Sequence, residues 1–84
     1  MHEIEFTKNA SKQFFKLPYE IQERILSVLE RARIRPHSYF ERLVGEKAHK
    51  LRIGKYRVIA DIFDDKLLIL VLEIGLRKNI YDRV

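Results

Sequence analysis

Residues 50–57, KLRIGKYR, hold the side chains in this sequence that are best suited to chemistry. Lys50, Arg52 and Arg57 alternate with apolar residues, so an extended chain places them on one face. Gly54-Lys55 fits a two-residue hairpin loop with glycine first, which makes Arg52 and Arg57 direct cross-strand neighbours. Like charges placed in this way are destabilising, and the stretch contains no acidic residue to neutralise them. Because the arginine fork matches the geometry of a phosphate, the hairpin predicts a phosphate-binding site.

A second group of such side chains follows the last apolar run. Arg77 adds a guanidinium, and Tyr81 adds a ring that can stack on a nucleotide base. A turn at Asp64-Asp65 would place Leu72 opposite Arg57 in an antiparallel pair, so that Arg77 and Tyr81 return toward the hairpin. The hairpin cations and the tail then converge on one site, and this combination suits RNA better than a generic anion.

The alternative interpretation of the hairpin charges is structural. Lysine and arginine on an exposed strand keep a sheet from pairing with other sheets. Other chemistry has little support, since His2 and His37 are isolated in the sequence. Asp61, Asp64 and Asp65 do not form a metal-ligand set, because two of them make a turn and hard cations need more oxygen ligands. We therefore expect no metal and no cofactor.

Composition sets the class of protein. The chain has 84 residues, 46% of them hydrophobic and 35% charged, which predicts one folded domain over residues 1–84. A net charge of +5 favours an acidic partner such as nucleic acid or an acidic protein. There is no cysteine, no signal peptide is visible after Met1, and the longest apolar run, Leu67–Leu72, is too short to span a bilayer. We expect a cytoplasmic protein without a membrane span.

Hydrophobic spacing predicts an α+β fold in the order β-α-α-β-β-β, with a mainly antiparallel sheet packed on a helical hairpin. Residues 36–47 are expected to form a loop in which Leu43 or Val44 packs against the core. Gly75 is expected to end the last strand, before a polar tail. The other expected elements are a strand over 2–6, helices over Thr7–Leu17 and Pro18–Arg35, and strands over 50–53, 56–62 and 67–74.

The sequence resembles the RelE toxins of bacterial and archaeal toxin–antitoxin pairs, in the wider RelE/ParE superfamily. The resemblance covers nearly the whole chain and is most specific in KLRIGKYRVIADI and LLILVLEIGLRKNIYD. The superfamily's G-x-Y-R-like hairpin reads Gly54-Lys55-Tyr56-Arg57 here, and its G-x-R…Y tail reads Gly75-Leu76-Arg77…Tyr81. The resemblance implies a RelE-like, microbial-ribonuclease-like fold and a metal-free endonuclease that cuts messenger RNA in the ribosomal A site and inhibits translation.

In the activity that the resemblance implies, the ribose 2′-hydroxyl attacks the adjacent phosphate, and cations stabilise the charge that develops. By position, Lys50 would assist deprotonation of the hydroxyl, and Arg57 would stabilise the phosphate. Arg77 would interact with the leaving 5′-oxygen, and Tyr81 would orient the nucleotide. The candidate catalytic residues are therefore Lys50, Arg57, Arg77 and Tyr81. The candidate RNA-binding residues are Arg52, Lys55, Lys47 and Lys78.

The partners implied by the resemblance are a cognate RelB-like antitoxin, the ribosome and messenger RNA. Leu68, Leu70 and Leu72 would share the outer face of the sheet with Arg57, and an exposed strip of leucine is unusual on a soluble monomer. An antitoxin would cover this strip and neutralise the basic site. The first strand and the tail are the alternative covers.

The sequence departs from the RelE pattern next to the hairpin. RelE enzymes often carry two lysines two residues apart in this strand, and here Ala48 precedes Lys50 at that spacing. The general base is then Lys50 alone or His49, and the expected place of His49 on the inner face argues against it. Two alternative functions stay open. One is a ParE-like toxin that poisons DNA gyrase without cutting RNA, and the other is a basic nucleic-acid-binding module without catalysis.

Overall fold

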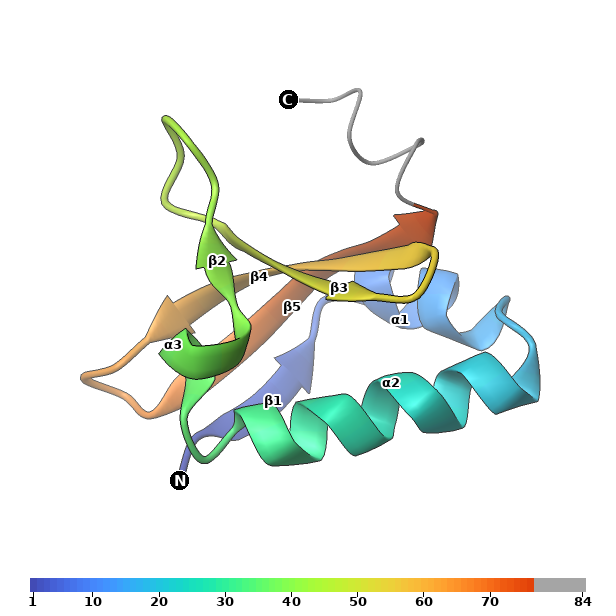
Figure 1. Cartoon of the computed structure of the whole chain (residues 1–84), viewed down its shortest axis with the longest axis horizontal. Helices are drawn as coiled ribbons and strands as arrows, with labels where there is room; N and C mark the ends of the chain where they lie inside the picture. Colours follow the sequence, from blue (N-terminus) through green and yellow to red (C-terminus); the bar gives the residue numbers. More distant parts are fainter. Residues whose placement is uncertain (77–84) are drawn as a thin grey trace.

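The computed structural model describes residues 1–76, which form a five-stranded sheet with helices packed against it (Figure 1). The strand order is β1-β5-β4-β3-β2, in which β1 is parallel to β5 and the other neighbours are antiparallel. The predicted α+β class and mainly antiparallel sheet are therefore confirmed. No helix in residues 1–76 is long and apolar enough to cross a membrane. The elements are β1 (Glu3–Phe6), α1 (Lys8–Phe15), α2 (Tyr19–Ala32), α3 (Pro36–Tyr39), β2 (Glu41–Arg42), β3 (His49–Ile53), β4 (Tyr56–Phe63) and β5 (Leu68–Leu76).

The residue types at the ends of α1 and α2 explain where these two helices begin and end. Thr7 caps α1, since its hydroxyl accepts a hydrogen bond from the Ala10 N–H at 3.1 Å. Pro18 separates α1 from α2, because it has no N–H to continue the first helix. The prediction that α2 reaches Arg35 was wrong. Arg35 precedes Pro36 and is extended, at φ −138° and ψ 78°, because a proline disfavours the helical conformation in the residue before it.

The core lies between the helices and one face of the sheet. Phe14 of α1 and Ile25 and Leu29 of α2 pack on β-strand residues that alternate along β4 and β5. Val58 and Ala60 are fully buried on this inner face, as the period of two along β4 predicts. The amphipathic stripe of α2 and the alternation of β4 were thus sufficient to identify the main core.

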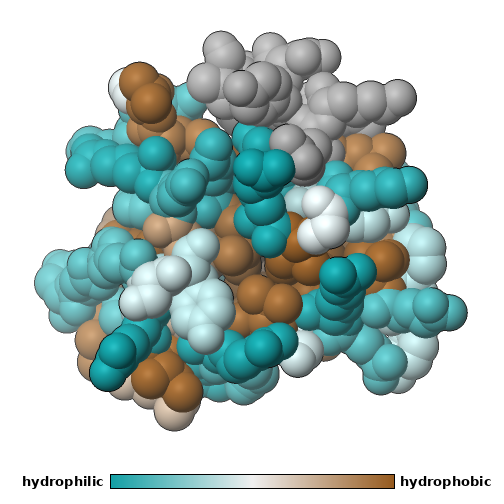
Figure 2. All heavy atoms as spheres, in the orientation of Figure 1, coloured by the Kyte–Doolittle hydropathy of each residue, from teal (hydrophilic) through white to brown (hydrophobic). Residues whose placement is uncertain are grey.

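The segment between α2 and β3 forms a second, smaller core on the outer face. Expected as a loop, it contains the short α3 and the two-residue β2. Leu43 is 7% exposed and packs with Ala48, Ile59 and Leu72, whereas Val44 is 94% exposed. Figure 2 shows hydrophobic atoms at the tip of the β2–β3 loop, with hydrophilic side chains next to them. This segment covers part of the leucine strip, for which the sequence had suggested other covers.

The register between β4 and β5 differs from the prediction. Gly75, not Leu72, lies opposite Arg57, and β5 continues through Gly75 to Leu76. The connecting loop spans residues 64–67 and is therefore longer than the turn that was expected at Asp64-Asp65. A β-bulge between Ile59 and Ala60 of β4 adds a further shift, since Ala60 pairs with Val71 and Ile59 with Glu73.

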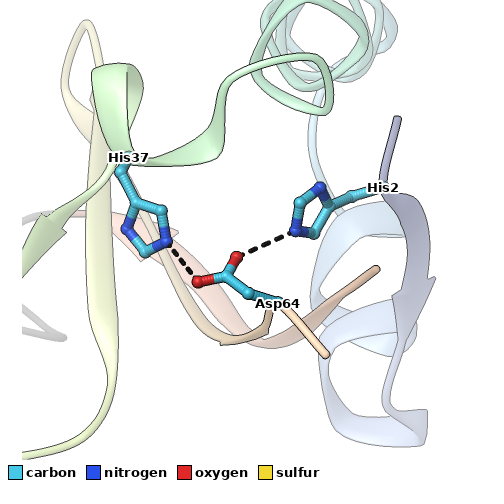
Figure 3. Close-up of polar contacts among 3 residues, drawn as sticks. All are labelled: His2, His37 and Asp64. Carbon is cyan, nitrogen blue, oxygen red and sulfur yellow. Dashed lines mark hydrogen bonds and ion pairs between the residues drawn. The ribbon is translucent and has the colours of Figure 1, made fainter. Parts of the chain in front are cut away.

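One carboxylate ties three distant segments together at the end of the sheet that lies away from the β3–β4 turn. Asp64 accepts hydrogen bonds from Nε2 of His37 at 2.9 Å and of His2 at 3.0 Å, and Figure 3 shows both rings pointing at it. These bonds, that of His37 first, lower the pKa of Asp64. The His37 ring also contacts the His49 ring edge to face, at 5.5 Å between centroids. Burial, followed by repulsion from His37 and Arg42, lowers the pKa of His49.

Acidification from pH 7.5 to pH 5 is expected to destabilise the fold through His49. A lowered folded-state pKa means that the unfolded chain takes up the proton more readily. The stabilisation is therefore complete above the ordinary histidine pKa of 6.5 and is lost as the pH falls through the folded pKa. Urea unfolding at both pH values should show a smaller loss of unfolding free energy for His49→Gln than for the unchanged protein. Asp64 does not interfere, because its lowered pKa lies below 3.8. Equal losses in the two proteins would contradict this role of His49.

Candidate functional site

Three of the predicted cations, Lys50, Arg52 and Arg57, lie on the outer face of the β3–β4 hairpin. Directly opposed residues of an antiparallel pair share a face. Arg52 pairs with Arg57, and Lys50 pairs with Ile59, on the face opposite to Val58 and the helices. The two-residue loop at Gly54-Lys55 is confirmed: Gly54 has φ +60°, and Leu67 is the only non-glycine residue of the described part at positive φ. The strand register therefore places the hairpin cations on one face, as expected.

Arg57 is almost entirely buried, with 2% of its surface exposed, whereas Arg52 beside it is exposed. The interpretation of the hairpin charges as solvated side chains thus fails for Arg57. Removing a guanidinium from water is costly, and arginine cannot avoid the cost by losing its proton. A buried charge flanked by a second arginine is weak evidence for stability and is typical of a functional site.

The residue opposite Arg57 leaves room for its side chain. Gly75 pairs with Arg57, so at this register position β5 has no side chain on the outer face. Any other residue at position 75 would project a Cβ beside the guanidinium. Gly75 therefore adds no side chain to the outer face next to Arg57, and Leu76 is the last described residue of β5.

Acidic side chains lie at the sides of the site. Glu41 of β2 pairs with Lys50, and its carboxylate lies 3.9 Å from the Lys50 Nζ, whose side chain is 22% exposed. A partly exposed pair at this distance is a weak restraint, so the Lys50 amine stays available to a ligand. Glu73 pairs with Ile59 on the same face. The Glu41 contact was not predictable from a sequence pattern, because β2 is only two residues long.

The remaining candidates are dispersed or not described. Lys55 is exposed in the hairpin turn, and Lys47 is exposed in the β2–β3 loop. Arg77, Lys78 and Tyr81 lie outside the described residues, so their convergence on the site stays a prediction. Sequence reasoning missed Arg24 of α2, whose Nη1 lies 3.5 Å from the position of a Cβ added at Gly54. This guanidinium adds a cation at the tip of the hairpin, and no spacing in the sequence connects the two.

The histidine cluster does not form part of this site. His49 pairs with Ala60, so it faces the inner side of the sheet, as expected, and its buried Nδ1 makes no hydrogen bond. Within residues 1–76 no group of three or more His, Cys, Asp or Glu side chains could hold a metal ion. The chemistry available to the described part of the site is therefore the binding and electrostatic stabilisation of an anion by Lys50, Arg52 and Arg57.

Comparison with known proteins gives the family. Residues 4–81 match the model of the ParE toxin of type II toxin–antitoxin system, parDE. An Escherichia coli protein named as RelE-like toxin is 29% identical over 81 residues, 93% of this chain and 85% of that protein. A chain of the toxin–antitoxin complex RelBE2 from Mycobacterium tuberculosis superposes with a TM-score of 0.83 at 23% identity, over 90% of this chain and 91% of that chain.

The isolated RelE toxin of Escherichia coli superposes with a TM-score of 0.79 at 21% identity, over 99% of this chain and 94% of that one. These superpositions show that the sheet and helices have the arrangement found in RelE toxins. The family model spans nearly the whole chain, from β1 to beyond β5. The protein therefore belongs to the ParE toxin family of type II toxin–antitoxin systems, in the RelE/ParE superfamily, and is a RelE-like toxin in fold.

Proposed function

We propose that this toxin is a metal-independent endoribonuclease that cuts messenger RNA on the ribosome and so inhibits translation. The observation that carries the proposal is the buried Arg57, held beside Arg52 and opposite the side-chain-free Gly75. A phosphodiester is an anion whose oxygens match the planar fork of a guanidinium, and Arg52 adds positive charge beside it. Because Arg57 is covered in the described state, RNA reaches it only after the cover has moved.

The proposed reaction is an internal transfer at one phosphate. The 2′-oxygen forms a bond to phosphorus, the bond from phosphorus to the 5′-oxygen breaks, and the products are a 2′,3′-cyclic phosphate and a 5′-hydroxyl end. Lys50 takes the proton of the 2′-hydroxyl as general base, and the departing 5′-oxygen receives a proton from solvent water. Arg57 stabilises the negative charge on the non-bridging oxygens, which is greatest in the transition state. Arg77 completes the site at the leaving 5′-oxygen, and Tyr81 completes it at the nucleotide base.

The ribosome is required in this proposal because the site has cations but little acid–base machinery of its own. The three histidines of the chain lie away from it, tied to Asp64 or facing the inner side of the sheet. Holding the 2′-hydroxyl in line with the phosphate is worth many kcal/mol in such reactions. A ribosome that fixes the messenger RNA supplies this positioning, so free RNA should be cut poorly.

The proposed partner that silences the toxin is a cognate antitoxin. The related RelBE2 protein of Mycobacterium tuberculosis is described as a toxin–antitoxin complex. This chain carries a net charge of +5, and Arg52 and Lys55 are exposed beside the site. An antitoxin segment with acidic side chains would be attracted to this face and would exclude RNA from it.

A ParE-like toxin that acts on DNA gyrase is the second candidate function. It is favoured by the family model, which is named for the ParE toxin. The two functions make different demands on Arg57, because a gyrase-binding toxin has no phosphate to stabilise at this residue.

Replacing Arg57 should abolish cleavage. We expect Arg57→Gln to lower the rate of messenger RNA cleavage on programmed ribosomes by about 100-fold or more, because a preorganised charge at the phosphate is lost. The rate is measured by mapping RNA 5′ ends over time. Arg31→Gln is the matched control: it removes the same charge from an exposed position on α2 and should keep normal cleavage. Absence of ribosomal cleavage by the unchanged protein, together with inhibition of gyrase supercoiling, would overturn the proposal in favour of the second candidate.

The general base is tested by comparing two neighbours on β3 that face opposite sides of the sheet. Lys50→Met should reduce the single-turnover cleavage rate by about 100-fold, since general-base catalysis contributes on that order. His49→Gln should change it less than about threefold, because a residue on the inner face makes no contact with the 2′-hydroxyl. The reverse ranking of the two variants would assign the proton transfer to His49 and reject Lys50.

A further inference from the structure

The C-terminal part of β5 extends past the strand that flanks it. β1 ends at Phe6, which pairs with Val71, whereas β5 continues to Leu76. On this side, residues 72–76 have no strand beside them in the described part of the chain. α1 follows β1 and packs against this part of β5 (Figure 1). A helix cannot offer a ladder of backbone donors and acceptors, so its side chains must satisfy the backbone groups of β5.

Three polar side chains, from the N-cap and two turns of α1, perform this task. The Thr7 hydroxyl and the Asn9 amide both donate to the Leu72 carbonyl oxygen, at 3.2 Å and 3.4 Å. The Ile74 N–H donates to Gln13 Oε1 at 2.7 Å, and this is the shortest of the three hydrogen bonds. Gln13 therefore takes the place of a strand carbonyl next to Ile74.

These contacts lie where the β-bulge changes the alternation of β5. Before the bulge, the carbonyl groups of Leu67 and Val71 point to β1 and accept from its backbone. After it, the Leu72 carbonyl and the Ile74 N–H point to the same side and meet α1. The backbone groups that point away from β4 thus belong to odd-numbered residues before the bulge and to even-numbered residues after it. One inserted residue produces this change.

The bulge determines which residue of β5 lies opposite Arg57. Continuing the Ala60–Val71 pairing without the bulge would place Ile74 opposite Arg57 and Glu73 opposite Val58. Glu73 would then face the core beside a fully buried valine, and the Ile74 side chain would fill the space next to Arg57. With the bulge, Ile74 is buried in the core and Gly75 lies at Arg57.

We propose that Gln13 is a positioning residue of the toxin: it holds the bulged end of β5 in the register that sets Gly75 beside Arg57. Gln13 touches neither Arg57 nor the outer face, and it acts through the Ile74 amide. The part of this inference that concerns RNA cleavage rests on the proposed function. The part that concerns the register of β5 does not.

The test compares two replacements of nearly equal length and helix propensity. Gln13→Met removes the acceptor, and Gln13→Glu keeps an oxygen that can accept from Ile74. We expect the Ile74 amide of Gln13→Met to exchange with deuterium about tenfold faster than in the unchanged protein, and ribosomal cleavage to fall about tenfold. Gln13→Glu should stay within about threefold of the unchanged protein in exchange, because its acceptor is retained.

Ile25→Val is the control for a purely structural effect, since it weakens the core at α2 and leaves the β5 edge intact. It should lower the global unfolding free energy without selectively accelerating exchange at Ile74, and folded protein should cleave normally. The positioning role is overturned if Gln13→Met leaves Ile74 exchange unchanged, or if it accelerates exchange while cleavage by the folded protein equals that of Ile25→Val. The positioning role also requires slow exchange of the Ile74 amide in the unchanged protein. Fast exchange of this amide would overturn the role, even if Gln13→Met does not fold. If the unchanged protein does not cleave RNA, the proposed function fails, and Ile74 exchange alone decides the register role.

Discussion

The energetic cost of a buried guanidinium constrains this fold more than any other single interaction. Arg57 is 2% exposed and lies opposite another arginine on the same face. The next residue of β4 on that face, Ile59, shows what a stability-driven choice looks like, because it is a buried apolar side chain in a small hydrophobic cluster. Burial of a charge at position 57 is therefore weak evidence of a stabilising role. The β-bulge and the glycine opposite determine what lies beside this side chain, because together they place Gly75 at Arg57.

The hairpin cations and the two histidines bound to Asp64 lie at opposite ends of the sheet. The hairpin end carries lysine and arginine, whereas Asp64 with His2 and His37 lies at the other end of β4 (Figure 3). Histidine is the side chain that titrates nearest neutrality, and here it joins the N-terminal segment and α3 to the β4–β5 loop. In the proposed function, such a site stabilises developing charge through its arginines and depends on its substrate being held in place by the ribosome.

Local patterns in the sequence were enough to predict the helices and strands, but not the pairing register of every strand. The stripe of α2, the alternation of β4 and the glycine of the hairpin loop each act over a few residues, and the register of β3 on β4 followed from them. The register of β5 did not follow. Leu67 adopts φ +52°, a conformation that is uncommon for leucine and that its residue type therefore does not predict. This conformation lengthens the loop. The bulge depends on side chains that lie about sixty residues away in the sequence, such as Gln13 to Ile74.

The same limit applies to the site. Alternation assigned Lys50, Arg52 and Arg57 to one face, and the structure brings these three together. Alternation cannot tell whether a face is covered, so the burial of Arg57 had no signal in the sequence. Contacts between elements, such as Glu41 to Lys50 and Arg24 at Gly54, depend on how a two-residue strand and a helix pack, which is decided by the whole core.

The C-terminal part of β5 is held less firmly than its first part. The first part of β5 is held between β1 and β4 by ladders on both sides, but residues 72–76 have β4 on one side and three side-chain hydrogen bonds on the other. Side-chain bonds of this kind break at a lower free energy than a central ladder, so local opening here is more frequent than global unfolding. The proposed cleavage requires a phosphate to reach the buried Arg57, and local opening at this end of β5 is one movement that would uncover the residue paired with Gly75.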